Sequence, residues 1–216
     1  MDLTDSIRDN YDRVADEYAR RIYAELQHKP LDRRLLDRFA AATAGRGEVC
    51  DFGCGPGHVA RYLHDAGARA TGLDLSPAML DQARRLNPGM TFRQGNMLAL
   101  DLPDNSFAGI AAFYAIVNLP ESELPAVFRE MHRVLQPGGL LLLAFHIGDE
   151  IRNVTAMWER PVSMDFYYFQ PAVIRRLLES AGLQIDEIVE RDPYPEDEHQ
   201  SRRAYIFATK PATTAL

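Results

Sequence analysis

Three glycines at alternate positions give the most specific chemical signal in this sequence of 216 residues. Gly53, Gly55 and Gly57 follow a short apolar run at residues 49–52 and precede a stretch with helical periodicity. Glycine has no Cβ atom, so the backbone at a turn from strand to helix can approach a ligand closely. The pattern predicts a nucleotide-type binding site, although glycines alone would also suit a simple tight turn.

Two carboxylates flank this glycine loop. Asp51 lies two residues before Gly53, and Asp74 ends the next apolar run, 21 residues after Gly53. A carboxylate at the Asp74 position can accept hydrogen bonds from both hydroxyls of a ribose. Dinucleotide-binding oxidoreductases share this arrangement, but their third glycine follows the second by three residues, so that a helix N-terminus receives a pyrophosphate. The closer spacing here, and the negative charge of Asp51, favour a ligand that carries an ammonium group.

Further motifs occur in an order that is typical of a known superfamily. The glycine loop and Asp74 are followed by Gln-Gly-Asn-Met at 94–97 and by Arg-Val-Leu-Gln-Pro-Gly-Gly at 133–139, before an apolar strand. Together they resemble the class I S-adenosylmethionine-dependent methyltransferases over about residues 5–210. The chain is most similar to the small-molecule branch that includes the ubiquinone and menaquinone C-methyltransferases (methyltransferase type 11). The N-terminal pattern Tyr11-Asp12-x-x-Ala15-x-x-Tyr18 resembles the lid helix of that branch.

The resemblance implies S-adenosylmethionine as cofactor, S-adenosylhomocysteine as product and a set of cofactor-binding residues. The three glycines would line the methionine moiety, with Cys54 among the cofactor contacts. Asp51 would face the amino group of that moiety directly or through water, and Asp74 would hold the ribose hydroxyls. Asn96 stands where such enzymes commonly have Asp, and its amide oxygen can still accept a hydrogen bond from adenine. The other implied contacts are Tyr11, Tyr18, Leu75, Met79, Met97 and Phe113. The two tyrosines and Met79 have helical spacing that would equally suit a hydrophobic core, and Cys54 would equally suit a space filler.

Methyl transfer from a sulfonium needs little acid or base chemistry, because the cofactor already carries the leaving group. A base is needed only where the acceptor must lose a proton. His146, at the end of the fifth predicted strand, is the candidate, since an unperturbed histidine has a pKa of about 6.5. A histidine that caps the strand end is the alternative. Tyr114, expected beneath the sulfonium at the end of the fourth strand, is the second candidate catalytic residue, and no catalytic role is assigned to Asn118, near which relatives often carry His.

The acceptor site is expected in residues 147–169, a long connection that holds the only tryptophan and four consecutive aromatic residues. A long aromatic loop over the mouth of a site is typical of a lid or a binding surface. Trp158 and Tyr167 from this segment and Arg202 near the C-terminus are the candidate substrate-binding residues. Aromatic packing on neighbouring helices, and an arginine that is solvated or paired with the acidic residues 196–198, are the alternatives.

Apolar periodicity predicts the elements that position these residues. A three- and four-residue repeat predicts a helix over 5–26 and a second over 31–42, so residues 1–44 would form a helical lid or support. Short apolar runs then alternate with helical stretches: the runs are 49–52, 70–73, 90–93, 107–113 and 140–145, and the helices 58–65, 76–86 and 122–135. This alternation predicts an α/β fold with a doubly wound, mostly parallel, Rossmann-like sheet of seven strands.

The C-terminal part completes that sheet. A helical stripe at 173–181 ends at Gly182, and the apolar runs 183–189 and 204–209 are too close together for a crossover helix. They are therefore predicted to form an antiparallel hairpin at the sheet edge. The length favours a single methyltransferase domain over 1–216, with a cofactor-binding core at 45–146, a substrate loop at 147–169, and a last helix and hairpin at 170–210.

Composition limits the partners. Asp and Glu (31) exceed Lys and Arg (24), and a net charge of -7 opposes binding to nucleic acid or an anionic membrane. The cysteines, Cys50 and Cys54, lack a second pair that would complete a metal site, so no metal is expected. The longest apolar run, 139–145, is far shorter than the ~20 residues of a membrane span, and the N-terminus is polar, so a cytoplasmic protein is expected.

These observations together predict S-adenosylmethionine-dependent methyl transfer to a small-molecule acceptor by in-line displacement. A nucleotide (NAD)-binding oxidoreductase and a non-catalytic cofactor-binding module are the alternatives. The acceptor, the atom that is methylated and the oligomeric state do not follow from the sequence.

Overall fold

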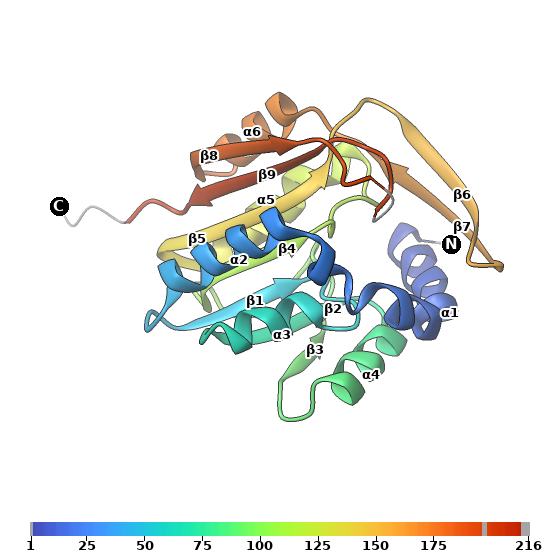
Figure 1. Cartoon of the computed structure of the whole chain (residues 1–216). Helices are drawn as coiled ribbons and strands as arrows, with labels where there is room; N and C mark the ends of the chain where they lie inside the picture. The colour runs from blue at the N-terminus through green and yellow to red at the C-terminus, as the bar shows by residue number, and fades with distance from the viewer. Residues whose placement is uncertain (1, 196–197, 213–216) are drawn as a thin grey trace.

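Seven strands form one sheet in the computed structural model, which describes residues 2–195 and 198–212 (Figure 1). The strand order is β3-β2-β1-β4-β5-β9-β8. The strands are β1 (Glu48–Phe52), β2 (Arg69–Asp74), β3 (Phe92–Gln94), β4 (Phe107–Phe113), β5 (Leu135–His146), β8 (Gln184–Arg191) and β9 (Arg203–Thr209). Strands β1 to β5 pair in parallel, whereas β9 is antiparallel to both β5 and β8. The predicted mostly parallel sheet with a C-terminal antiparallel hairpin is confirmed.

Helices cover both faces of the sheet. Helices α2 and α3 lie on one face with α4 beside α3, while α5 and α6 lie on the other (Figure 1). Their bounds are α2 (Pro30–Thr43), α3 (His58–Asp65), α4 (Pro77–Leu86), α5 (Leu124–Val134, after the 3-10 turn η2, Glu121–Glu123) and α6 (Pro171–Ser180). Each helix turns an apolar stripe inward: Phe39 of α2 and Phe128 of α5 are fully buried on opposite faces. The doubly wound arrangement follows from these stripes.

The N-terminal helix α1 (Leu3–Ile22) lies across the carboxyl ends of the parallel strands rather than on a face of the sheet (Figure 1). A 3-10 turn, η1 (Glu25–His28), connects it to α2. Val14 and Ala15 of α1 are buried in a small apolar cluster with Met79 of α4 and Met164. Helix α1 is thus a cover over one end of the sheet, held there by its own hydrophobic contacts.

Residues 147–169 do not form the predicted loop. They contain a two-stranded antiparallel sheet, β6 (Ile151–Met157) and β7 (Arg160–Tyr167), that projects beside α1 (Figure 1). Val162 and Met164 of β7 are buried against α1, while Ser163 between them and Asp165 after them are exposed. An apolar side chain at every second position is the pattern of a half-buried strand. The prediction of a loop gave weight to the aromatic residues instead of to this alternation.

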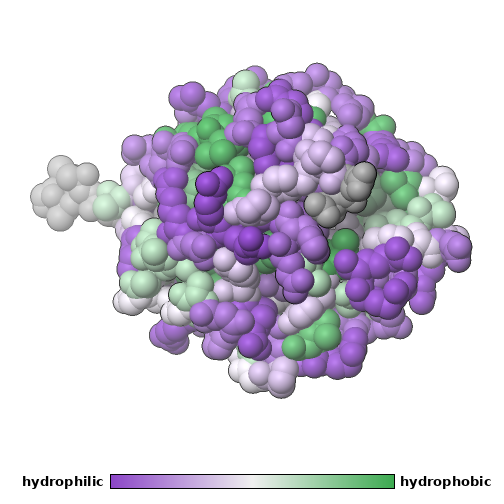
Figure 2. Space-filling view, viewed as in Figure 1, coloured by the Kyte–Doolittle hydropathy of each residue, from purple (hydrophilic) through white to green (hydrophobic). Residues whose placement is uncertain are grey.

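The molecular surface is largely polar on the face shown in Figure 2, where apolar side chains gather only in separate patches. Within the described parts of the chain, no helix combines the length and the apolar character that crossing a membrane requires.

Candidate functional site

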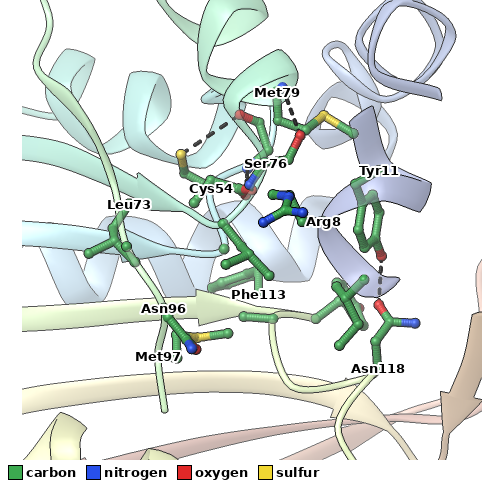
Figure 3. Close-up of a pocket in the computed structure, with 18 of the residues that line it drawn as sticks. Arg8, Tyr11, Cys54, Leu73, Ser76, Met79, Asn96, Met97, Phe113 and Asn118 are labelled. Atoms are coloured by element: carbon green, nitrogen blue, oxygen red, sulfur yellow. Dashed lines mark hydrogen bonds between the residues drawn. The ribbon is translucent and has the colours of Figure 1, made fainter. Parts of the chain in front are cut away.

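A cavity of about 1010 Å³, open on one side, lies where the carboxyl ends of β1, β2 and β4 meet α1. In a parallel sheet, ligands bind at this edge because the loops after successive strands converge there. Figure 3 shows its wall, with Tyr11 reaching from α1 toward Asn118 and Arg8 of the same helix directed into the space between. The cavity is therefore enclosed by the sheet on one side and by α1 on the other.

Most of the predicted cofactor contacts line this cavity: Tyr11, Tyr18, Gly53, Cys54, Gly55, Asp74, Leu75, Met79, Asn96, Met97 and Phe113. Tyr114, the second candidate catalytic residue, also lines it. The structure thus brings together residues from α1, from the glycine loop and from the ends of β2, β3 and β4.

Asp51 and Gly57 do not line the cavity. Asp51 is 2% exposed, and its carboxylate accepts a hydrogen bond from the backbone N–H of Ala60 at 3.0 Å. Burial raises its pKa well above the ordinary value for Asp. Gly57 precedes α3 in the left-handed region (φ +81°), where a Cβ atom would come within 2.8 Å of Asn87 and Phe92. These two residues shape the loop from beneath. The contact of Asp51 with the cofactor amino group, directly or through water, stays a prediction.

Asp74 closes one wall of the cavity with a buried carboxylate. Its Oδ2 accepts from the backbone N–H of Gly55 at 2.7 Å and its Oδ1 accepts from the N–H of Ser76 at 2.8 Å. Burial raises the pKa of Asp74, and the N–H donors partly oppose that shift. Each oxygen keeps a second lone pair, so the carboxylate can still accept hydrogen bonds from two ligand hydroxyls.

The part of the cavity beyond Asp74 is suited to a flat apolar ring system. Leu75, Met79, Met97 and Leu98 line it, and thioether side chains adapt readily to planar groups. The Oδ1 atom of Asn96 accepts from the backbone N–H of Leu98 at 3.0 Å, which leaves its second lone pair and its NH₂ group for a ligand. Together with Asp74, this lining fits a nucleoside such as that of S-adenosylmethionine.

Side-chain hydrogen bonds fasten α1 over the cavity. The Tyr11 hydroxyl donates to Oδ1 of Asn118 at 2.7 Å, and Asn118 donates in turn to the backbone carbonyl of Asp165 in β7 at 2.8 Å. Asp12, the next residue of α1, accepts from the Ser76 hydroxyl and caps the start of α4. Helix α1 is thus bound to α4, to the segment after β4 and to the β6–β7 hairpin.

Tyr114 and His146 lie one behind the other at the base of the cavity. Tyr114 has φ +56°, a left-handed conformation that costs a bulky residue about 1–2 kcal/mol. The His146 ring packs behind it at 4.8 Å between centroids, with Nδ1 2.7 Å from the Ser201 hydroxyl oxygen, and it does not line the cavity. Burial, with Arg203 and His199 adding to it, lowers the pKa of His146 to about 3. The pKa of His146 therefore lies below the value of about 6.5 on which its candidacy as a base depended, and His146 is a weak base that is neutral at pH 7.

The three candidate substrate-binding residues do not meet in the main cavity. Trp158 lies at the turn between β6 and β7, edge-on to Tyr18 at 5.7 Å. Tyr167 lines a second, smaller cavity that shares Asn118 with the first. Arg202 is exposed and pairs with Glu190 at 2.8 Å and with Asp192 at 3.4 Å. Of the acidic residues 196–198 suggested as its partners, 196 and 197 lie outside the described residues.

Three charged or titratable residues line the cavity that sequence reasoning did not select: Arg8, Glu25 and His58. His58 directly follows the glycine loop, and Arg8 lies one helical turn before Tyr11, so both had a positional signal. Arg8 is paired with Asp5 at 2.8 Å and with Asp9 at 2.9 Å. Glu25 falls inside the helix predicted over 5–26, but α1 ends at Ile22 and Glu25 lies in the 3-10 turn η1 (Glu25–His28).

Comparison with known proteins identifies the family. Residues 49–139 match the model of a methyltransferase domain. Residues 49–139 therefore form a methyltransferase domain, in a fold shared with S-adenosylmethionine-dependent methyltransferases. The comparisons give no support to an oxidoreductase or a non-catalytic module.

Relatives of known name and structure show how far the likeness extends. A malonyl-[acyl-carrier protein] O-methyltransferase of Erwinia billingiae is 32% identical over 78% of this chain and 64% of its own length. A methyltransferase structure from Methanosarcina mazei has a TM-score of 0.68 at 19% identity, covering 76% of this chain and 92% of that one. A glycopeptide N-methyltransferase solved with S-adenosylmethionine has a TM-score of 0.61 at 19% identity, covering 76% and 87%. The chain spans less than two thirds of the length of the curated relative, so that relative's acceptor is not transferred to it.

Proposed function

We propose that this methyltransferase transfers a methyl group to a small-molecule acceptor that binds beneath α1, beside Tyr11 and Tyr114. The enclosure of the cavity carries the proposal: α1 crosses its mouth and is hydrogen-bonded to α4, to the segment after β4 and to the hairpin. A folded macromolecule cannot enter such a space, whereas a small acceptor can. The net charge of -7 also opposes an acceptor in nucleic acid.

The bound cofactor supplies an electrophilic methyl carbon together with its leaving group. The residues of this chain align and shield the reactants for an in-line displacement. Asp74 and the glycine loop hold the nucleoside, and Tyr11 and Tyr18 exclude water from above. Burial raises the pKa of Tyr114, so its hydroxyl is neutral. That hydroxyl oxygen is itself buried, so Tyr114 contributes its ring to the cavity wall rather than a hydrogen bond to the acceptor.

His146 acts as a positioning residue in this proposal. It supports the Tyr114 ring from behind and does not touch the cavity, and its low pKa makes it a poor proton acceptor. The acceptor therefore arrives with an available lone pair, or it loses its proton to solvent. The hairpin residues Trp158 and Tyr167 form the outer part of the acceptor entrance.

Three broader expectations stay predictions: a single domain, a cytoplasmic location and a closer kinship with the ubiquinone and menaquinone C-methyltransferases. They are compatible with the fold, and the proposal above does not depend on them.

Ligand binding followed by turnover tests the proposal. S-adenosylhomocysteine at about 100 times its Kd should raise the melting temperature by roughly 5 to 10 °C, and NADH should not. A panel of small acceptors with isotopically labelled methyl donor should then yield a labelled product. A thermal shift with NADH alone would refute cofactor recognition. Binding of S-adenosylhomocysteine with no transfer to any acceptor class would favour the non-catalytic alternative.

A further inference from the structure

One carboxylate in the cavity has no role in the scheme above. Glu25 lines the cavity together with Tyr18, Gly53 and Gly55, the residues expected around the amino-acid end of the cofactor. Asp74 is the other acidic side chain in the described lining of the cavity, and its two oxygens already accept from the N–H groups of Gly55 and Ser76. A carboxylate in this place is available to a ligand cation.

Two basic side chains hold Glu25 in place. Its Oε2 accepts from Nζ of Lys29 at 2.7 Å, and its Oε1 lies 3.1 Å from Nε2 of His58. Lys29 is itself buried, with Glu198 as its second partner at 3.7 Å. The Glu25 side chain keeps 21% of its surface exposed, and each oxygen has one lone pair beyond these contacts. The carboxylate is thus fixed in direction and still able to accept hydrogen bonds.

Glu25 is also ionised under all physiological conditions. Burial alone would raise its pKa, but His58 and Lys29 outweigh that effect and lower the pKa to about 2. Asp51 is the opposite case, because it is 2% exposed, is bonded to the Ala60 N–H and lies outside the cavity lining. A ligand ammonium beside Gly53 and Gly55 therefore meets the charge of Glu25 and not that of Asp51.

We propose that Glu25 binds the ammonium group of the cofactor's amino-acid end, and that Lys29 and His58 position its carboxylate for this contact. The proposal rests on the proposed function only in placing the methionine moiety at the glycine loop. It replaces Asp51, the carboxylate that the sequence motif indicates, with a residue from the turn after α1. Binding of the amino-acid end would then also fix η1, which connects α1 to α2.

The test compares two ligands that differ only in the ammonium group: S-adenosylhomocysteine and its deamino analogue, in which hydrogen replaces the amino group. Titration calorimetry gives the ratio of their dissociation constants for each variant. A hydrogen bond between charged groups supports about a tenfold to hundredfold preference of the wild-type protein for S-adenosylhomocysteine. In Glu25→Gln that preference should fall to about threefold or less, while the affinity for the deamino analogue changes about twofold at most.

Asp51→Asn is the matched comparison, because it neutralises the alternative carboxylate and should leave the ratio at its wild-type value. Loss of the preference in Asp51→Asn but not in Glu25→Gln would overturn the proposal, as would equal weakening of both ligands in Glu25→Gln, which marks a purely structural role. If Glu25→Gln does not fold, Glu25→Asp should keep the charge and a reduced preference, and an unchanged preference there would refute the contact. Failure of the wild-type protein to bind either ligand would instead refute the proposed function.

Discussion

Replacement of Asp74 by Asn removes one negative charge from the cavity wall and changes few atoms. If the carboxylate holds the ribose hydroxyls, hydrogen bonds to a charged group worth about 1.5–3 kcal/mol are lost, and the affinity for S-adenosylhomocysteine should fall about tenfold to a hundredfold. The structure adds a second effect. Asp74 accepts from the N–H groups of both Gly55 and Ser76, and the Asn amide can accept from only one of them through its single oxygen. The unmatched N–H should lower the free energy of unfolding by about 1–3 kcal/mol.

The pH dependence of ligand binding also tests the role of Asp74. Burial raises the pKa of Asp74 in the free protein, and ligand hydroxyls donate more strongly to the ionised carboxylate than to the protonated carboxyl group, so binding lowers that pKa. Affinity is then full above the pKa of the free protein and declines as the pH falls through it. Because that pKa is raised, the decline should begin at a higher pH than an ordinary Asp would give, and it should be absent in Asp74→Asn.

Titration calorimetry with S-adenosylhomocysteine between about pH 4.5 and 8 measures the affinity and its pH dependence, and denaturant unfolding measures the stability. Asp81→Asn is the matched control, since Asp81 lies on α4 with its side chain 76% exposed and does not line the cavity. Its affinity and pH profile should equal those of the wild-type protein. An Asp74→Asn variant with wild-type affinity and a wild-type pH profile would refute the placement of the ribose at Asp74.

Three further substitutions test the cover, the loop and the histidine. Tyr11→Phe removes the 2.7 Å hydrogen bond to Asn118 and should speed dissociation of S-adenosylhomocysteine about two- to tenfold in stopped-flow displacement; an unchanged rate would mean that this bond does not hold α1 closed. Gly53→Ala places a Cβ atom 2.8 Å from that of Ala115 at φ +65°, and should cost about 1–3 kcal/mol in denaturant unfolding, a loss that a wild-type midpoint would contradict. His146→Gln should leave the shape of the pH–rate profile between about pH 5 and 8 unchanged, because a group whose pKa is about 3 does not titrate there; the loss of an inflection would assign His146 the role of base.

Local pattern determined the elements of the core. The helix predicted over 58–65 and the strand predicted over 107–113 are observed with these same bounds, because apolar periodicity and flanking turn residues act within a few positions of the chain. The hairpin β6–β7 is the exception. Its alternation at Val162 and Met164 is a local signal too, but only burial against α1 distinguishes it from an aromatic loop.

The glycine loop and Asp74 could be predicted as one site from the sequence, because of the topology of a parallel sheet. The glycine loop and Asp74 each end a strand, and parallel strands bring their carboxyl ends to one edge of the sheet. No knowledge of side-chain packing is needed for that inference. Asn118 and Glu25 had no comparable signal, since they reach the cavity from irregular segments whose course depends on the packing of α1 and α5.

The charge state and direction of single side chains depended on tertiary structure alone. Burial lowers the pKa of His146, and Asp51 is buried beneath the glycine loop at 2% exposure. The residue types on either side of them in the sequence do not indicate this burial. The neighbouring residues Arg202 and Arg203 also differ in burial in a way that the sequence does not predict. Side chains of successive residues entering a strand point in opposite directions, and the position of β9 between β5 and β8 decides that Arg203 is buried at 2% exposure while Arg202 pairs with Glu190 in solvent. Two identical residue types are therefore told apart only by the sheet on which they lie.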